Sequence, residues 1–395
     1  MGNENSGTWA SNIMKDLSER LHDSNKVVLV PDHGTPNKDQ ARAILTKRLR
    51  IFAKEQCVQN YFDVGRAGIA HNLMIEQGLI KPGYLVVGGD SHTCTAGAIG
   101  AFGTGVGYTD LAVIMATGEM WMMVPDTLKC TYLVLIPKWI TGKDFALLMT
   151  KKLGPDGALY KAIEFNGEGT SNLDISGRVA LCNMAIECGA KAGIVPVDRI
   201  TIEFITSVLG KKTGEIISED LKPDLNAYYE KEYSFDISNM SPLVAIPYSP
   251  SKVKIVEEVA GIKIDQAFIG SCANGMIKDL RLAAMVLKGK TVHPNVRLIV
   301  IPATPQIWKQ SMREGLLSIF ADGGARGAVI GYQTCSPCSG QHMGILAEGE
   351  RAVATTNRNF IGRIRHPLSE VYIANPAVTA ASAIVGELVH PEEVV

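Results

Sequence analysis

The sequence predicts an α/β protein built on parallel, doubly wound sheets. Short β-branched or otherwise apolar runs alternate with helix-like stretches, most regularly in the last third of the chain, and this alternation is typical of strand-helix-strand units. Several of the apolar runs end in small and polar residues, as strands do where they open into the crevice of such a sheet. The 395 residues are enough for two or three domains with buried cores.

Composition excludes several classes of protein. A hydrophobic content of 46% with 20% charged residues is ordinary for a globular protein. The net charge of -1 gives no indication of nucleic acid or an acidic membrane as a partner, and no apolar run of about 18 residues predicts a membrane span. The polar N-terminus lacks a signal-peptide pattern, so we expect a cytoplasmic protein, or an organellar one without its transit segment. The eight scattered cysteines favour reduced thiols and ligands over disulfides.

The first predicted strand covers residues 26–30 and follows a short predicted helix over residues 16–22. It ends in Asp32 and His33, a carboxylate beside an imidazole. The carboxyl end of a strand is where α/β proteins place acid and base groups, so the pair is a candidate for catalysis. An Asp that bonds the backbone of its own turn would give the same sequence, and the local pattern does not decide between the two.

A second histidine comes after a predicted helix over residues 38–55 and a predicted strand over residues 61–64. His71 precedes an apolar, helix-like stretch at residues 72–78. A single histidine in such a place is more often structural than functional. His71 is therefore a candidate that needs a second observation.

The most polar strand end follows the predicted strand at residues 84–88. Asp90, Ser91 and His92 stand there, before a glycine-rich tract. Together they supply an acid or base and hydroxyl donors on one loop, and glycine lets a backbone approach a ligand closely. A phosphate-binding loop is the competing interpretation, but neither a P-loop pattern nor a completed G-x-G-x-x-G after a strand is present.

The middle of the chain is predicted to hold a strand over residues 131–135 and a capped helix that begins at Thr141. Asn183 and Glu187 lie four residues apart in an apolar helical stretch, on one face of the helix. A carboxylate there costs free energy unless it is paired, so Glu187 is expected either to face a polar pocket or to form a surface salt bridge. Residues 218–250 are more polar and are interpreted as a linker or an excursion between domains.

Three cysteines follow predicted strands in the last third of the chain. Cys272 comes after an apolar run, and Cys335 and Cys338 form a C-x-x-C motif after the predicted strand at residues 327–330. Strand ends of a parallel sheet meet at one edge, so the three thiols can converge on one soft metal centre. The C-x-x-C alone fits zinc, iron-sulfur and redox sites, and the absence of a nearby fourth soft ligand disfavours zinc. The other elements predicted here are a helix at residues 277–287, a strand at 296–301, and helices at 307–317 and 377–386.

Two arginines, Arg358 and Arg363, follow Asn357 in a stretch rich in amides. A guanidinium binds a carboxylate through two parallel hydrogen bonds, so a pair of arginines suits an acid with more than one carboxylate. Isolated arginine pairs are usually surface residues. Beside a metal site they favour a small di- or tricarboxylic acid as substrate.

These motifs together resemble those of the aconitase superfamily, and within it the large subunits of isopropylmalate isomerases. The resemblance covers residues 27–395, and seven motifs in family order are specific where each alone is weak. They are Pro31-Asp32-His33, Gly68-Ile69-Ala70-His71, Gly89-Asp90-Ser91-His92-Thr93-Cys94-Thr95, Asn183-Met184-Ala185-Ile186-Glu187, Gly270-Ser271-Cys272, Thr334-Cys335-Ser336-Pro337-Cys338 and Asn357-Arg358-Asn359-Phe360-Ile361-Gly362-Arg363.

The resemblance implies three α/β/α subdomains of the aconitase type around a central iron-sulfur cleft, over residues 1–125, 126–250 and 251–395. The swivelling fourth domain, which bears a serine base and another substrate arginine in single-chain aconitases, is absent and would be a separate small subunit. This chain alone is then expected to lack the proton-abstracting group. We expect no nucleic acid and no membrane as partner.

The resemblance also implies a cofactor and roles for individual residues. Cys272, Cys335 and Cys338 would hold one 4Fe-4S cluster per chain, with one iron open to act as a Lewis acid on substrate. His33, oriented by Asp32, would protonate the departing hydroxyl. The remaining residues would surround the open iron or bind substrate: His71, Asp90, His92 and Glu187 as catalytic groups, and Ser91, Asn183, Asn357, Arg358 and Arg363 as substrate-binding groups.

The function implied is a hydro-lyase that isomerises 2- and 3-isopropylmalate by dehydration and rehydration, as in leucine biosynthesis. Homoaconitase and dehydratases of methyl-substituted malates are alternatives of the same class, and a non-catalytic binding protein of this fold is an alternative of another class. Two departures from the family pattern stand out. Ala273 replaces a common Thr after the first cluster cysteine, and the polar residues 1–25 replace several tens of residues that usually precede the Asp-His motif and contact substrate.

Overall fold

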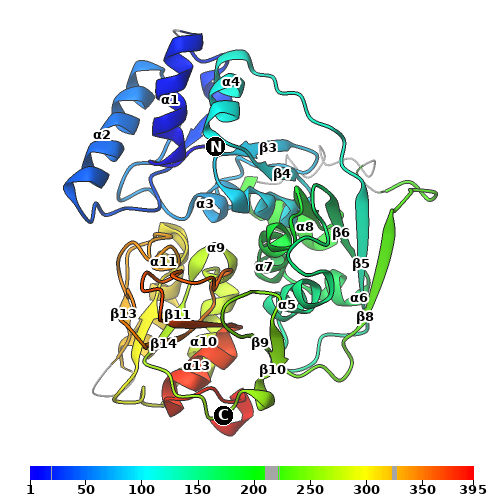
Figure 1. The fold of residues 1–395 in the computed structure, drawn as a ribbon, viewed down its shortest axis with the longest axis vertical. Helices are drawn as coiled ribbons and strands as arrows, with labels where there is room; N and C mark the ends of the chain where they lie inside the picture. The colour runs from blue at the N-terminus through cyan, green and yellow to red at the C-terminus, as the bar shows by residue number, and fades with distance from the viewer. Residues whose placement is uncertain (19, 210–220, 222, 323–326) are drawn as a thin grey trace.

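The computed structural model describes all residues except 19, 210–220, 222 and 323–326. Its helices and strands form three regions, each with sheet structure of its own. Figure 1 shows the N-terminal region at the top, the second region at the right and the third at the lower left. In the described ranges, no helix is both long enough and apolar enough to cross a bilayer.

The N-terminal region contains two separate pairs of parallel strands, β1 with β2 and β3 with β4. Its elements are α1 (Ser6–Leu17), η1 (Ser24–Lys26), β1 (Val28–Leu29), α2 (Gln40–Glu55), β2 (Asn60–Tyr61), α3 (Ala70–Glu76), β3 (Leu85–Gly88), η2 (Ser91–Ile99), β4 (Phe102–Gly105) and α4 (Tyr108–Thr117). The helix predicted over residues 16–22 is wrong, because α1 begins at Ser6 and ends near the start of that range. It packs on α2 and α4 through mostly small residues around Ala10 and Met14, so its buried face contains few of the large apolar side chains that mark a helix in a sequence.

The second region is an all-parallel, four-stranded sheet in the order β7-β6-β5-β8. Its elements are β5 (Thr127–Leu133), α5 (Gly142–Leu153), β6 (Ala162–Asn166), α6 (Glu168–Asn172), α7 (Ile175–Asn183), η3 (Met184–Cys188), β7 (Ala192–Ile194), α8 (Arg199–Leu209) and β8 (Lys231–Asp236). A capping box at Thr141 confirms the predicted start of α5.

The linker predicted over residues 218–250 is corrected by the structure, since β8 and β9 lie within it. β8 pairs with β5 over its whole length, and its alternation turns Phe235 into the core while polar neighbours face outward. Because the exposed face of an edge strand carries polar residues, the composition of such a strand resembles that of a linker. Residues 218–220 and 222 of the predicted linker lie outside the described residues.

The third region is a seven-stranded sheet in the order β10-β9-β15-β14-β11-β12-β13. Its elements are β9 (Leu243–Ala245), β10 (Val253–Ile255), η6 (Val256–Glu258), β11 (Gln266–Ile269), α9 (Ser271–Asn274), α10 (Ile277–Leu287), β12 (Arg297–Val300), α11 (Pro305–Arg313), α12 (Leu316–Ala321), β13 (Val329–Ile330), β14 (Arg351–Ala354), β15 (Glu370–Ala374), α13 (Pro376–Val385) and η7 (Pro391–Glu393). The predicted parallel arrangement is confirmed for β11 to β15, whereas β9 and β10 form an antiparallel edge.

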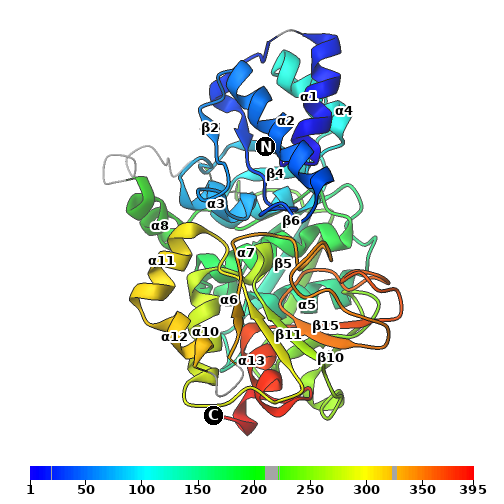
Figure 2. The same cartoon turned by 90° about the vertical axis from the view of Figure 1, so that its left-hand side faces the viewer.

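The helix predicted over residues 307–317 is two helices, α11 and α12. Gly315 between them has a φ of +73°, which a continuous right-handed helix does not accept. Helices α10, α11 and α12 pack against one another along one side of the sheet (Figure 2).

The three regions meet around the short helix α9. It lies between α3 of the N-terminal region and α7 of the second region and contacts both (Figure 1). The segment η2 also contacts both of those helices. One group of buried apolar side chains extends through all three regions. Strand ends and helix starts from different parts of the chain are therefore held against one another at this junction.

Candidate active site

Three thiols converge at the edge of the seven-stranded sheet. β11 and β13 both run parallel to β12, so their carboxyl ends lie on the same side. Cys272 lies in α9, directly after β11, and Cys335 and Cys338 follow β13. All three line one cavity, Asn357 contacts both Cys272 Sγ and Cys338 Sγ, and all three cysteines are buried and free of disulfides. The structure thus brings together the three sulfurs that the strand ends predict to meet.

The chain reaches Cys272 through an unusual turn. Gly270 has a φ of +152° and Ser271 a φ of +78°. A Cβ at position 270 would lie 2.8 Å from the carbonyl oxygen of Ile301, so glycine is required there. This turn aims the Cys272 thiol at the C-x-x-C segment instead of along the strand.

Nitrogen donors surround the sulfur atoms. The amide Nδ2 atoms of Asn183 and Asn357 each lie 3.2 Å from Cys272 Sγ. Arg363 Nη2 lies 3.0 Å from Cys338 Sγ. Such donors stabilise sulfur most when it is anionic, which is the form that binds iron or zinc.

The pKa values of the thiols follow from the same contacts. A hydrogen bond from Cys335 lowers the pKa of Cys272 to about 6, against the opposing effect of burial, and the charges of His92 and His71 add to it. The hydrogen bond from Cys335 also holds the pKa of Cys338 well below its usual range. Two of the three sulfurs are therefore disposed to be thiolates, so this donor set fits a metal-sulfur cofactor.

The thiols border a cavity of about 130 Å³. It is lined by Asp32, His33, Ile69, His71, Asp90, Ser91, His92, Cys272, Cys335, Cys338, Ser339, Asn357, Arg358 and Arg363. Of the residues that the sequence predicts for the site, Asn183 and Glu187 do not line this cavity. They lie directly behind its wall, where Asn183 contacts Asn357 and Glu187 contacts Arg358.

His33 is held between carboxylates at the cavity wall. Its Nδ1 lies 2.6 Å from Asp32 Oδ1, and its Nε2 lies 3.4 Å from Asp90 Oδ2. Asp32 is fixed in turn, because its Oδ2 accepts from the Ala70 N–H at 2.9 Å. Burial lowers the pKa of His33, but the charge and hydrogen bond of Asp32, with smaller contributions from Asp90 and Glu4, raise it to about 10. His33 therefore carries its proton at neutral pH and can act as an acid.

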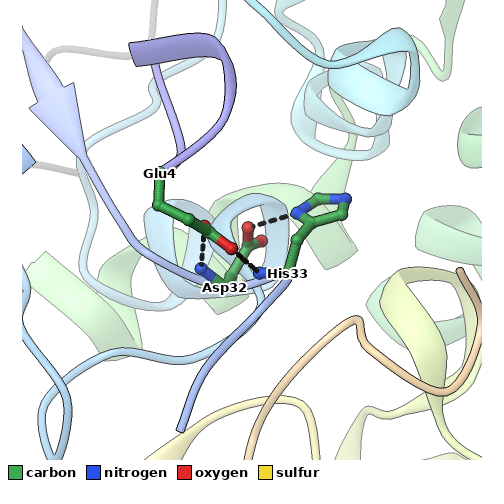
Figure 3. A group of neighbouring side chains, drawn as sticks. All are labelled: Glu4, Asp32 and His33. Carbon is green, nitrogen blue, oxygen red and sulfur yellow. Dashed lines mark hydrogen bonds and ion pairs between the residues drawn. The ribbon is translucent and has the colours of Figure 1, made fainter. Parts of the chain in front are cut away.

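The backbone of this Asp-His turn is held by Glu4, which sequence analysis did not single out (Figure 3). The Glu4 carboxylate accepts from the N–H of Asp32 at 3.0 Å, from that of His33 at 3.1 Å, and from that of Gly34. Ligand-type atoms of Glu4, Asp32 and His33 lie within 4.8 Å of one another, but the N–H donors already engage the Glu4 oxygens, so we interpret the group as a hydrogen-bonded unit. No local pattern marks Glu4, because its partners are backbone groups 28 or more residues further along the chain.

Asp90 is shared by three histidines. Its Oδ1 lies 3.2 Å from His71 Nε2 and 3.6 Å from His92 Nδ1, while its Oδ2 faces His33. Burial would raise the pKa of Asp90, but the hydrogen bonds from His71 and His92 outweigh it and hold that pKa well below its usual range. The same contacts raise the pKa of His71 and bring that of His92 to about 9, despite burial. His71 is therefore a member of the site, not an isolated core histidine.

Glu187 connects this histidine group to Arg358. Its Oε1 lies 2.8 Å from His92 Nε2 and 2.8 Å from Arg358 Nε. Only 8% of Glu187 is exposed, so its salt bridge with Arg358 lies directly behind the cavity wall and not at the surface. The helix changes from α7 to η3 between Asn183 and Glu187, yet both side chains still point to the site.

Known proteins support this assignment of fold. The Aconitase family (aconitate hydratase) matches residues 10–261 and 254–386. The 3-isopropylmalate dehydratase large subunit of Thermodesulfovibrio yellowstonii is 53% identical over 373 residues, which cover 94% of this chain and 87% of that protein. The protein of the same name from Moorella thermoacetica is 51% identical over 396 residues, 100% and 92% of the two chains. The crystal structure of Thermococcus kodakaraensis aconitase X (holo-form) matches with a TM-score of 0.51 at 13% identity, over 91% of this chain and 81% of that chain, and supports the fold alone.

The chain therefore belongs to the aconitase family, the class of protein that the fold and the site define. Within that family its sequence stands with the 3-isopropylmalate dehydratase large subunits, which it matches at about 50% identity over nearly its whole length.

Proposed function

We propose that this chain is the large, catalytic subunit of an iron-sulfur hydro-lyase that isomerises 2-isopropylmalate and 3-isopropylmalate by dehydration and rehydration. The proposal rests on one observation above all: three thiols, protonated histidines and two arginines meet in one cavity of a chain that is 53% identical to a 3-isopropylmalate dehydratase large subunit. Dehydration breaks a C–O and a neighbouring C–H bond. The site therefore needs a proton donor for the hydroxyl, cations for the carboxylates and a base for the C–H proton.

Cys272, Cys335 and Cys338 would hold a 4Fe-4S cluster. The amide and guanidinium donors on their sulfurs would stabilise the anionic ligands. When bound by three cysteines, such a cluster keeps one iron without a protein ligand and supplies a Lewis acid for oxygen atoms of the substrate.

His33 would give its proton to the departing hydroxyl, which leaves as water. The hydrogen bond between Nδ1 and Asp32 holds the ring in place and keeps it charged. The Nε2 proton remains on the side of the cavity, beside Asp90. In the rehydration direction the neutral ring would take a proton back from water.

The arginines would bind the carboxylates of the acid. Arg358 uses Nε for Glu187, which fixes the plane of its guanidinium at the cavity wall. Arg363 uses Nη2 for Cys338, and its Nε is buried without a partner among the described residues. A buried donor without an acceptor costs free energy that a substrate carboxylate would recover. Ser91 and Asn357 would complete the polar wall around the substrate, and Asn183 would hold Asn357 from behind that wall.

The base is proposed to come from a separate small subunit that carries the swivelling domain. The carboxylates of the described site are engaged by histidines, arginine or backbone amides. His33 and His92 are held in their charged form, and His71 is paired with Asp90. None of these groups is poised to accept a proton from carbon at neutral pH. The names of the relatives as large subunits agree with this need for a second chain.

Hydration of isopropylmaleate tests the proposal. The anaerobically purified chain is assayed alone and with a separately expressed small subunit, by loss of the ultraviolet absorption of the conjugated double bond. We expect turnover with the small subunit and little without it, and slower turnover of citraconate and homoaconitate. Equal turnover by the large chain alone would contradict the argument for a missing base, and a preference for homoaconitate would contradict the substrate.

A further inference from the structure

One lysine is fully buried beneath the candidate active site. Lys143 is the second residue of α5 and is 0% exposed. Among the lysines that the structure describes, it is the one that is buried. Sequence analysis did not single it out, because a Thr-Gly-Lys-Asp helix start is ordinary on a protein surface.

Two features of this position oppose a positive charge. Burial removes the ammonium from water, which costs several kcal/mol on the order-of-magnitude scale for an ion that is not paired. The first turn of a helix is also its positive end, so a cation there is repelled by the backbone dipoles. Within the described part of the chain, no carboxylate lies close enough to Lys143 to form an ion pair with it.

The contacts of the ammonium lead directly to the thiols. Lys143 Nζ donates to the carbonyl oxygen of Thr356 at 2.9 Å and lies 3.4 Å from Met184 Sδ. Thr356 precedes Asn357 and Met184 follows Asn183, and these two asparagines donate to Cys272 Sγ. The Thr356 hydroxyl also contacts Cys338 Sγ. Lys143 therefore joins the second and third regions through the residues that adjoin the sulfur donors.

The charges around Lys143 also connect it to the thiols. Burial lowers the pKa of Lys143 to about 8, and the charge that opposes this most strongly is that of Cys272, followed by Asp279, Cys338 and Asp144. The oxygens of Asp279 and Asp144 accept from other groups: those of Asp279 from Asn274 and Met276, and those of Asp144 from Thr141, Leu243 and Asn375. The Asp279 and Asp144 oxygens are thus held by other donors, and Lys143 is a second cation near the sulfurs, beside Arg363 at Cys338.

We propose that Lys143 is a positioning residue for the cofactor: it holds the two asparagine donors against Cys272 and supplies a positive charge that offsets the charge of the sulfur ligands. This inference rests on the iron-sulfur part of the proposed function. Lys143 does not line the cavity, yet its charge is inferred to change the reduction potential of the cofactor directly. A structural lysine would have no such effect.

The test is the reduction potential of the reconstituted cofactor in Lys143→Met and Lys143→Gln. Met removes the charge at similar length, and Gln removes it while keeping an N–H donor. Lys151→Met is the matched control, since Lys151 lies in the same helix but is exposed. Reductive titrations followed by electron paramagnetic resonance give the equilibrium constant for uptake of one electron.

We expect this constant to fall by roughly tenfold in both Lys143 variants, because a unit charge across roughly 10 Å at an effective dielectric constant of about 20 has that effect. Lys151→Met should match the wild type. Wild-type constants in both Lys143 variants would overturn the inference, even if the variants were less heat-stable. A wild-type chain that takes up no iron and sulfide would instead overturn the proposed function.

A second measurement uses the unchanged protein and applies if the variants fail to fold. With lysine labelled by ¹³C at the ε-carbon, the buried lysine is the one whose resonance titrates well below the others in the apo-protein. We expect its titration to lie at higher pH with the one-electron-reduced cofactor than with the oxidised cofactor, because reduction adds a negative charge. Titration at the same pH in both forms would overturn the inference.

Discussion

At the scale of single residues, the site depends on one carboxylate shared by several imidazoles. Asp90 faces His33, His71 and His92, and it stays ionised because their hydrogen bonds and charges outweigh its burial. His33 and His92 in turn stay protonated because Asp90 and a second carboxylate lie near each of them: Asp32 for His33 and Glu187 for His92. The arrangement stores protons in a buried site at neutral pH, which suits a reaction that must protonate a leaving hydroxyl.

The pH dependence of activity follows from His33. Its pKa of about 10 lies above the ordinary value of 6.5, so the acid form is present at neutral pH and is lost as pH rises through about 10. Asp32→Asn removes the charge that raises this pKa and replaces the charge-assisted hydrogen bond with a neutral, weaker one. We expect kcat to fall by roughly 10²–10⁴-fold and the alkaline limb of the kcat profile to move to lower pH. Steady-state rates with the small subunit between pH 6 and pH 10 check this, and an unmoved alkaline limb in Asp32→Asn would rule out His33 as the acid.

The same pKa predicts how stability changes with pH. A group whose pKa is raised on folding contributes stability that is fully present below its unfolded pKa and is lost as pH rises through its folded pKa. For His33 this window runs from about 6.5 to about 10, and for His92 it ends near 9. The free energy of unfolding of the apo-protein should therefore decline over this range and decline less in Asp32→Asn.

The sequence predicted the residues of the site that stand in motifs and missed those that do not. The strand ends at Asp32, Asp90 and Cys272 can be recognised in the sequence by an abrupt change from apolar to small or polar residues. Glu4 and Lys143 act through distant backbone carbonyl or N–H groups, and no spacing in the sequence encodes such contacts. The sequence also did not predict that Asp90 is shared, because His33, His71 and His92 are far apart in the chain or on different turns and come together only in the fold.

At the scale of elements, the structure places chemistry where parallel strands end and short helices begin. Helices that pack through long apolar side chains, such as α10, could be predicted from sequence with their bounds. Helix α1 could not be predicted, because its buried face is mostly small residues. Strand β8 could not be predicted either, because it is an edge strand in which polar residues alternate with the buried ones. The break at Gly315 is a backbone conformation that composition alone does not reveal.

One element-scale prediction concerns the anchor of α8 on α7. Arg178 in α7 is fully buried, and both of its Nη atoms donate to the carboxylate of Asp198, just before α8. Removing one partner leaves the other charge without its counter-ion, which costs about 3–5 kcal/mol for a fully buried pair. Because Asp198 is partly exposed, we expect a loss near the lower end, about 3 kcal/mol, for Arg178→Met.

Denaturant titrations followed by circular dichroism measure this loss. Arg199→Met is the control, since Arg199 pairs with Glu203 four residues away on an exposed helix surface. We expect a change within about 0.5 kcal/mol for that variant. Equal losses in the two variants would show that burial of Arg178 does not set the strength of the contact.

At the scale of the whole molecule, the site exists only where three regions meet. The N-terminal region supplies the histidines and Asp90, the second region supplies Asn183 and Glu187, and the third supplies the cysteines and arginines. The sequence placed these groups at strand ends, which predicted that they could meet. It did not predict how the regions face one another, because that depends on the shared apolar core and on buried contacts such as that of Lys143 with Thr356.

The central claim is that Cys272, Cys335 and Cys338 bind one iron-sulfur cofactor together. Iron and acid-labile sulfide analysis of the anaerobically reconstituted chain tests it most directly, with Cys272→Ser as the variant and Cys57→Ser, which changes an exposed thiol, as the control. We predict about four iron and four sulfide per chain in the wild type and in Cys57→Ser, as a 4Fe-4S cluster requires, and a loss of both in Cys272→Ser. Stoichiometric zinc in a colourless wild-type protein, or full iron and sulfide in Cys272→Ser, would contradict it.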